Sequence, residues 1–137
     1  MAVKVLDSWA LMAFLYDEPA AADVESLLLK AAAEKHHLCL CVVNWGEIYY
    51  SVARADGEAA AEERAAHLAS LAIEIVPVSE DLRLIREAAK LKAKYRMSYA
   101  DCFAAALAKL RNAELVTGDP EFKQAQGDVK ICWLAAD

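Results

Sequence analysis

The sequence contains few of the residues that interrupt regular structure, with four glycines and three prolines among 137 residues. This scarcity excludes collagen-like chains and the low-complexity segments that are rich in glycine and proline. Charged residues make up 26% of the chain and hydrophobic residues 58%, which excludes the highly charged composition of a disordered protein. The length suits one domain with one buried core, so we expect residues 1–137 to form a single domain.

Neither a membrane span nor a targeting signal is found in the sequence. No stretch of about 18 or more residues is both apolar and uncharged, which is the pattern that predicts a membrane-spanning helix. The opening MAVKVLD has one lysine and few apolar residues before its aspartate, unlike a secretion signal. We therefore expect a soluble, cytoplasmic protein with no membrane partner.

Positive charge is scarce, because 15 lysines and arginines stand against 21 aspartates and glutamates and the net charge is −6. This balance argues against a protein that coats nucleic acid with its whole surface, since phosphate binding is mainly electrostatic. It is compatible with a local basic ridge and with an acidic metal site inside the molecule.

The four cysteines form no C-x-x-C pair. In the run HHLCLC, two histidines precede Cys39 and Cys41, which point to the same face of a predicted strand. A zinc cluster is conceivable here, but the spacing does not suit a finger or ribbon and a second half-site is missing. Buried structural thiols in a reducing compartment are the favoured interpretation.

Short β-like segments alternate with longer helical ones along the chain. Strands separated by helices pair in parallel through right-handed crossovers, which predicts an α/β fold with a three-layer α/β/α sandwich. The predicted strands are residues 3–6, 38–43, 73–78, 115–117 and 129–133. The predicted helices are residues 8–16, 20–35, 45–54, 58–71, 82–96, 99–110 and 120–126.

Four carboxylates stand at predicted helix starts, and three of them follow strands directly. They are Asp7, Glu47, Asp101 and Asp119. Each also fits a purely structural role at the beginning of a helix. The candidate caps are Asp7, the pairs Asn44–Glu47 and Ser98–Asp101 with capping-box spacing, and Asp119 before Pro120.

Taken together, the four acids predict more than helix capping. The carboxyl ends of parallel strands share one edge of a sheet, where ligands bind at the point of strand-order reversal. Carboxylates that converge there cannot all ionise unless cations compensate. Oxygen-only ligands suit Mg²⁺ or Mn²⁺, and these ions serve phosphoryl and phosphodiester chemistry.

Four segments in this order resemble the PIN domain, and in particular the VapC-type toxins of toxin–antitoxin modules. They are VLDSWALMAFLYDEP, VNWGEIYY, SYADCFAAALA and LVTGDPEF, and the resemblance spans essentially the whole chain. It implies a Mg²⁺- or Mn²⁺-dependent endoribonuclease built on a five-stranded parallel sheet. It also implies an RNA substrate, a small cognate antitoxin as partner, and a homodimer.

The resemblance further implies roles for single residues. Asp7 and Asp101 would be the principal metal ligands, and Asp119 would complete the metal shell directly or through water. Glu47 would orient or deprotonate the attacking water and would also belong to the metal-binding set. The hydroxyl residues Ser8 and Thr117 would support the carboxylates.

Trp9 departs from the family pattern, which has a small residue at this position. An indole there would narrow the entrance or stack on a base, as aromatic side chains do with unpaired nucleotides. Packing in the core is the competing and more ordinary interpretation.

Basic residues gather just before Asp101. They are Lys90, Lys92, Lys94 and Arg96, with Arg54 a weaker candidate elsewhere. Lys92, Lys94 and Arg96 would form a phosphate clamp for RNA, or else a solvated helix end that complements the helix dipole. The sequence leaves both interpretations open.

Two other functions compete with the nuclease. A phosphoacceptor module fits badly, because Asp7 is followed by Ser8 and Trp9 and not by the acids that such modules need. A non-catalytic PIN scaffold that acts through protein contacts is the stronger alternative. Trp45 and Tyr49 share a helix face, which favours core packing, although the resemblance implies that such residues lie near a homodimer or antitoxin contact.

Overall fold

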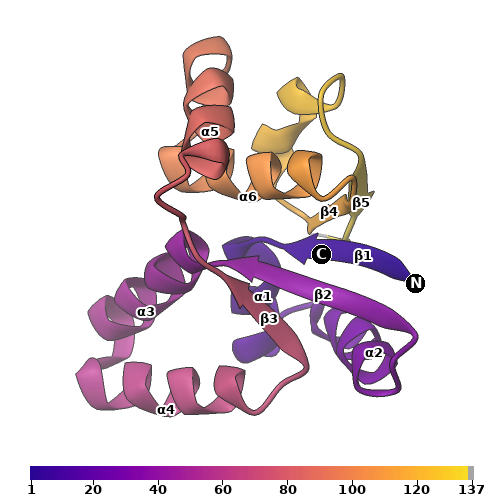
Figure 1. Ribbon diagram of the computed structural model, residues 1–137. Helices are drawn as coiled ribbons and strands as arrows, with labels where there is room; N and C mark the ends of the chain where they lie inside the picture. Colours follow the sequence, from indigo (N-terminus) through magenta and orange to yellow (C-terminus); the bar gives the residue numbers. More distant parts are fainter. Residues whose placement is uncertain (136–137) are drawn as a thin grey trace.

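The computed structural model describes residues 1–135, which form a parallel sheet between two layers of helices (Figure 1). Its strands are β1 (Ala2–Leu6), β2 (His36–Cys41), β3 (Ile73–Val76), β4 (Glu114–Thr117) and β5 (Ile131–Trp133). The strand order is β3-β2-β1-β4-β5, and each neighbouring pair is parallel. The predicted α/β/α fold with a five-stranded parallel sheet is confirmed.

The helices cover the sheet on both faces (Figure 1). They are α1 (Ser8–Leu15), α2 (Ala21–Ala32), α3 (Val42–Asp56), α4 (Glu58–Ala69), α5 (Arg83–Lys94) and α6 (Tyr99–Leu110), with the 3₁₀ helix η1 (Pro120–Ala125). On one face α5, α6 and η1 bury Val5 and Leu115 in a core cluster. On the other face α1 to α4 bury Leu6 and Val116. The side chains of successive strand residues therefore point into two separate cores, because side chains alternate between the two faces of a strand.

Helix α6 packs closely against the centre of the sheet because many of its buried side chains are alanines. Four alanines of the helix are fully buried against the sheet and the neighbouring helix α5, at positions 104, 105, 106 and 108. The same helix carries Asp101 in its first turn. Its alanine-rich face thus brings an acidic residue to the carboxyl edge of the sheet.

Helix α3 begins at Val42, three residues earlier than predicted, and β2 ends at Cys41. Asn44 therefore lies inside the helix, and the predicted Asn44–Glu47 capping box is wrong. The Asn44 side chain donates instead to the Ala100 carbonyl at 3.1 Å, which joins α3 to the start of α6. The capping predictions are confirmed at Asp7, at Asp119, and at Ser98, whose hydroxyl accepts from the Asp101 amide.

The cysteines are free thiols, and Cys39 and Cys41 are buried in the same core cluster, as predicted. Of the helices within residues 1–135, none is long and apolar enough to cross a membrane.

Candidate metal centre

The centre is built where the strand order reverses. From β1 the chain proceeds outward through β2 to β3, whereas β4 and β5 lie on the other side of β1. Ligands of parallel α/β folds bind at the carboxyl end of such a reversal. Asp7 follows β1 directly and Asp119 follows β4 after one glycine, so both carboxylates stand at this point.

Asp7 is 1% exposed and is held by hydrogen bonds to both of its oxygens. The Ala10 amide donates to Oδ1 at 2.8 Å, and the Thr117 hydroxyl donates to Oδ2 at 2.5 Å. Thr117 Oγ1 in turn accepts from the Asp119 amide at 3.0 Å. Thr117 therefore ties the acid after β1 to the turn after β4.

Asp101, Asp119 and Glu121 bring carboxylate oxygens within 4.8 Å of one another. Glu121 was not among the residues singled out from the sequence. The Asp119 side chain caps η1 by accepting from the Glu121 amide at 2.9 Å, and this tight turn folds Glu121 back toward the centre. Its sequence signal is the D-P-E spacing at the start of η1, but the same spacing fits an ordinary first-turn acid.

Glu47 faces the centre from α3. The Ser8 hydroxyl donates to Glu47 Oε1 at 2.5 Å. Glu47, Asp101 and Asp119 line one cleft of about 280 Å³. The other lining residues are Ser8, Trp9, Met12, Glu18 and Ser51.

Burial and mutual repulsion disfavour the ionised acids. The pKa of Asp7 rises to about 7, mainly because the carboxyl is buried. The hydrogen bonds from Thr117 and Ala10 lower this pKa, whereas repulsion from Asp101 and Asp119 raises it further. Burial likewise raises the pKa of Asp101 to about 6, with further contributions from Glu47 and Asp119. A divalent cation would relieve both effects. The all-oxygen donor set fits a hard ion such as Mg²⁺ or Mn²⁺.

The family model of the PIN domain matches residues 4–128. The chain belongs to the PIN domain family. The resemblance seen in the sequence is thereby confirmed, and a comparison with curated protein sequences found no significant match.

Solved structures share the fold at low sequence identity. A chain of the DNA-bound VapBC complex from Salmonella typhimurium has a TM-score of 0.74 and 14% identity, over 96% of this chain and 98% of that one. A chain of VapBC2 from Rickettsia felis, bound to a promoter DNA fragment, has a TM-score of 0.73 and 18% identity, over 97% and 99%. VapC20 from Mycobacterium tuberculosis, described as a sarcin-ricin loop cleaving toxin, has a TM-score of 0.69 and 19% identity, over 93% and 98%.

Trp9 of this PIN domain both packs and lines the cleft. It contacts the core cluster under α1, and its indole also lies against Gly118 in the turn after β4. A Cβ atom at Gly118 would stand 2.2 Å from the indole Cη2 atom. Packing of Trp9 is therefore observed and the residue borders the cleft, whereas its effect on the entrance or on a base stays a prediction.

Two of the basic side chains before Asp101, Lys92 and Lys94, already have polar partners. Lys92 Nζ donates to the Met97 carbonyl at 2.7 Å, and Lys94 pairs with Asp128 at 2.9 Å. The backbone amide of Arg96 donates to Gln124, and the residue is exposed. The phosphate clamp stays a prediction, and the pairing of Lys94 makes that residue its weakest member.

The aromatic residues of α3 differ in burial, since Trp45 and Tyr49 are partly buried and Tyr50 is exposed. Trp45 stacks on Tyr49 with ring centroids 5.6 Å apart, and both rings pack against the core under α4. Arg54, the weaker phosphate candidate, lies over the exposed ring of Tyr50 at 5.0 Å.

Proposed function

We propose that this PIN domain is a Mg²⁺- or Mn²⁺-dependent endoribonuclease that cleaves RNA phosphodiester bonds. The observation that carries the proposal is the convergence of Asp101, Asp119 and Glu121 beside the buried Asp7. The raised pKa values of Asp7 and Asp101, at a point of strand-order reversal, indicate a site whose charge balance calls for a cation. The similarity to VapC20, a sarcin-ricin loop cleaving toxin, supports RNA as the substrate class.

In the mechanism we infer, Asp7, Asp101, Asp119 and Glu121 would hold the cation directly or through water. When bound, the ion activates water and neutralises charge on the phosphate. Thr117 fixes the orientation of Asp7, and Ser8 fixes Glu47 through its Oε1 atom. Glu47 then uses Oε2 to orient the attacking water and to accept its proton.

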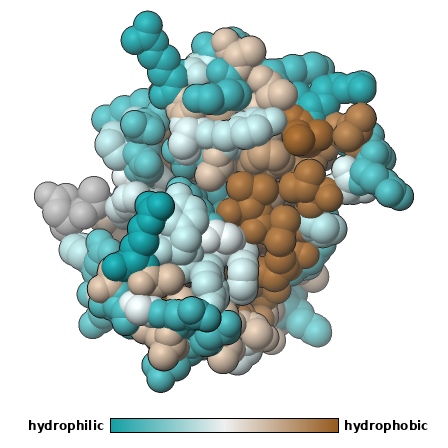
Figure 2. Space-filling model, turned by 90° about the vertical axis from the view of Figure 1, so that its left-hand side faces the viewer, coloured by the Kyte–Doolittle hydropathy of each residue, from teal (hydrophilic) through white to brown (hydrophobic). Residues whose placement is uncertain are grey.

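The same proposal includes the biological role of a toxin with a small antitoxin partner, in the cytoplasm, and a homodimeric state. Similar solved chains come from VapBC complexes, including one from nontypeable Haemophilus influenzae. Figure 2 shows an apolar patch framed by hydrophilic residues on one face of the molecule, which suits a protein partner. The exposed hydrophobic residues of the described chain include Val42, Tyr50, Ile75, Leu82 and Leu110.

The test is cleavage of total RNA by antitoxin-free protein with Mg²⁺, Mn²⁺ or EDTA. Asp101→Asn should abolish cleavage while the fold is retained. The matched control is Asp23→Asn, which changes an exposed acid in the first turn of α2 and should leave cleavage intact. Cleavage that persists in Asp101→Asn, or that is indifferent to EDTA, would reject the metal mechanism. A folded wild type that cleaves no RNA with either metal would favour the alternative of a non-catalytic PIN scaffold.

A further inference from the structure

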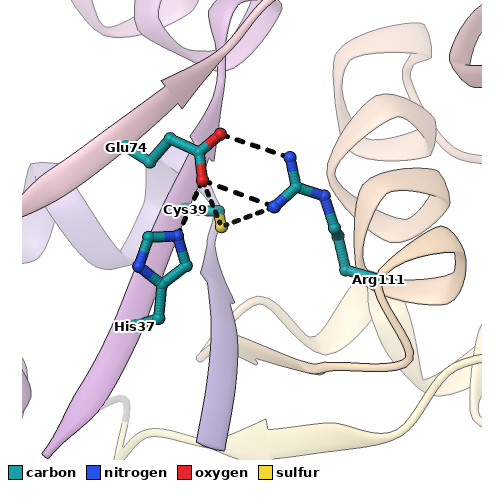
Figure 3. Close-up of polar contacts among 4 residues, drawn as sticks. All are labelled: His37, Cys39, Glu74 and Arg111. Atoms are coloured by element: carbon teal, nitrogen blue, oxygen red, sulfur yellow. Dashed lines mark hydrogen bonds and ion pairs between the residues drawn. The ribbon is translucent and has the colours of Figure 1, made fainter. Parts of the chain in front are cut away.

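A second cluster of metal-ligating side chains lies on β2 and β3, away from the carboxylate centre. His37, Cys39 and Glu74 each offer a ligand atom, and these atoms lie within 4.8 Å of one another. Figure 3 shows the imidazole, the thiol and the carboxylate pointing toward one another. His37 and Glu74 are the second residues of their strands, so the cluster stands near the amino end of the sheet, opposite to Asp7.

The strand register creates this juxtaposition. Cys39 and Glu74 are paired positions of neighbouring parallel strands. His37 lies two residues before Cys39 and therefore on the same face of β2. His36 lies on the opposite face for the same reason. The histidine pair of HHLCLC is thus divided between two faces, and the third ligand comes from a distant part of the sequence.

The distances approach those of a tetrahedral zinc site. Glu74 Oε1 lies 2.7 Å from His37 Nε2 and 3.7 Å from Cys39 Sγ. Zinc bond lengths place ligand atoms about 3.3–3.6 Å apart in a tetrahedron. Small side-chain rotations would reach that geometry. An imidazole, a thiolate and a carboxylate form a mixed donor set that suits zinc and not Mg²⁺.

Arg111, which follows α6, holds the carboxylate in place. Its guanidinium donates to Glu74 Oε2 at 3.2 Å and to Oε1 at 3.3 Å. Carboxylates that bind metals are commonly hydrogen-bonded by such outer partners. Another contact brings Arg111 Nη1 within 3.8 Å of Cys39 Sγ, where its charge favours the thiolate. Without a metal, burial raises the pKa of the Cys39 thiol to about 11.

The cluster is open to solvent on one side. The side chains of His37 and Glu74 are 44% and 38% exposed, whereas Cys39 is fully buried behind them. An ion can therefore arrive past the imidazole and meet the thiol at the bottom of the site.

We propose that His37, Cys39 and Glu74 bind one zinc ion, with water in the fourth position. The ion displaces the thiol proton to solvent and leaves Arg111 on the outer oxygen of Glu74. The ion links β2 to β3 and so stabilises the pairing of β3, which is an edge strand of four residues. This site is independent of the carboxylate centre and of the proposed nuclease activity.

The test is titration of the tag-free, reduced, full-length protein with Co²⁺, which replaces zinc and reports on its ligands. A sulfur-to-cobalt charge-transfer band should appear at one equivalent and disappear when Zn²⁺ is added. His37→Gln should weaken cobalt binding by at least about tenfold, since even loss of an outer-shell partner costs about 10–100-fold. The matched control His36→Gln changes the neighbouring imidazole on the other face and should bind as the wild type does.

Two further variants locate the thiolate. Cys39→Ser should abolish the band, whereas Cys41→Ser, a buried cysteine on the same strand face, should keep it. Asp101→Asn should also keep it, which separates this site from the carboxylate centre. Circular dichroism checks the fold of each variant. The proposal is overturned if the folded wild type gives no thiolate band, or if the band survives unchanged in folded His37→Gln.

Discussion

Replacing Asp7 with asparagine should stabilise the metal-free fold above pH 7, although it removes a residue of the proposed metal centre. Burial is the main reason that the pKa of Asp7 is about 7 in the folded chain, against an ordinary value of 3.8. Between these values the folded chain binds more protons than the unfolded chain, so the free energy of unfolding falls as pH rises. At about 1.4 kcal/mol per pH unit, the buried charge costs about 4 kcal/mol above pH 7.

Asparagine keeps nearly the same shape and stays uncharged. Its Oδ1 can still accept from the Ala10 amide, while its Nδ2 would donate to Thr117 Oγ1 and reverse the present hydrogen bond. That reversal deprives the Thr117 hydroxyl of its acceptor, at a cost of about 1–3 kcal/mol. We therefore expect a net gain of about 1–3 kcal/mol at pH 8. The gain falls by about 1.4 kcal/mol per pH unit below pH 7, so it becomes a net loss by pH 4, where only the cost at Thr117 is left.

Urea unfolding in EDTA at pH 8 and pH 5 measures this gain directly, with Asp23→Asn as the control for removal of an exposed acid. Added Mg²⁺ should stabilise the wild type more than Asp7→Asn, because the folded wild type binds the ion more tightly. A variant that is less stable than the wild type at pH 8 would refute the reasoning. So would a stability difference that does not change with pH.

Three further predictions concern the walls of the cleft and its surroundings. Glu121→Gln should weaken Mg²⁺ binding about tenfold by isothermal titration calorimetry, and unchanged affinity would remove Glu121 from the centre. Gly118→Ala should displace the Trp9 indole, shift its fluorescence, and lower the free energy of unfolding by about 1–3 kcal/mol because the added methyl overpacks the turn. An unaltered emission spectrum would contradict the contact. Neutralising Lys92 and Lys94 together should weaken RNA binding, with a smaller salt dependence and unchanged metal affinity, and equal binding at several salt concentrations would reject the clamp.

The fold could be predicted because each element has its own periodic pattern. Boundaries are harder to predict where a strand pattern runs into a helix pattern. Val42 and Val43 are β-branched, which predicts strand, yet β2 ends at Cys41 and α3 begins at Val42. The bond from Asn44 to the Ala100 carbonyl connects positions far apart in the sequence, so no local pattern indicates it.

The acids at strand ends could be predicted because topology brings them to one edge of the sheet. Glu121 could not be separated from an ordinary first-turn acid, which the helix dipole favours at any helix start. The cluster around Cys39 depends on the register between β2 and β3, because Glu74 lies opposite Cys39 only in this pairing. The register depends on how the two strands pair in the sheet, so it cannot be predicted from the sequence of either strand alone.

Helix capping and metal binding, which the sequence presents as alternatives, are compatible in this structure. Asp7 uses Oδ1 to cap α1, and Asp119 uses Oδ1 to cap η1. A cap bond fixes the rotamer of a short side chain and places its second oxygen in a defined direction. The amide dipoles at the start of α1 and α6 also lend partial positive charge to the region where the acids meet. The caps therefore preorganise the acids, and a bound cation would complete a charge balance that the helix starts only partly supply.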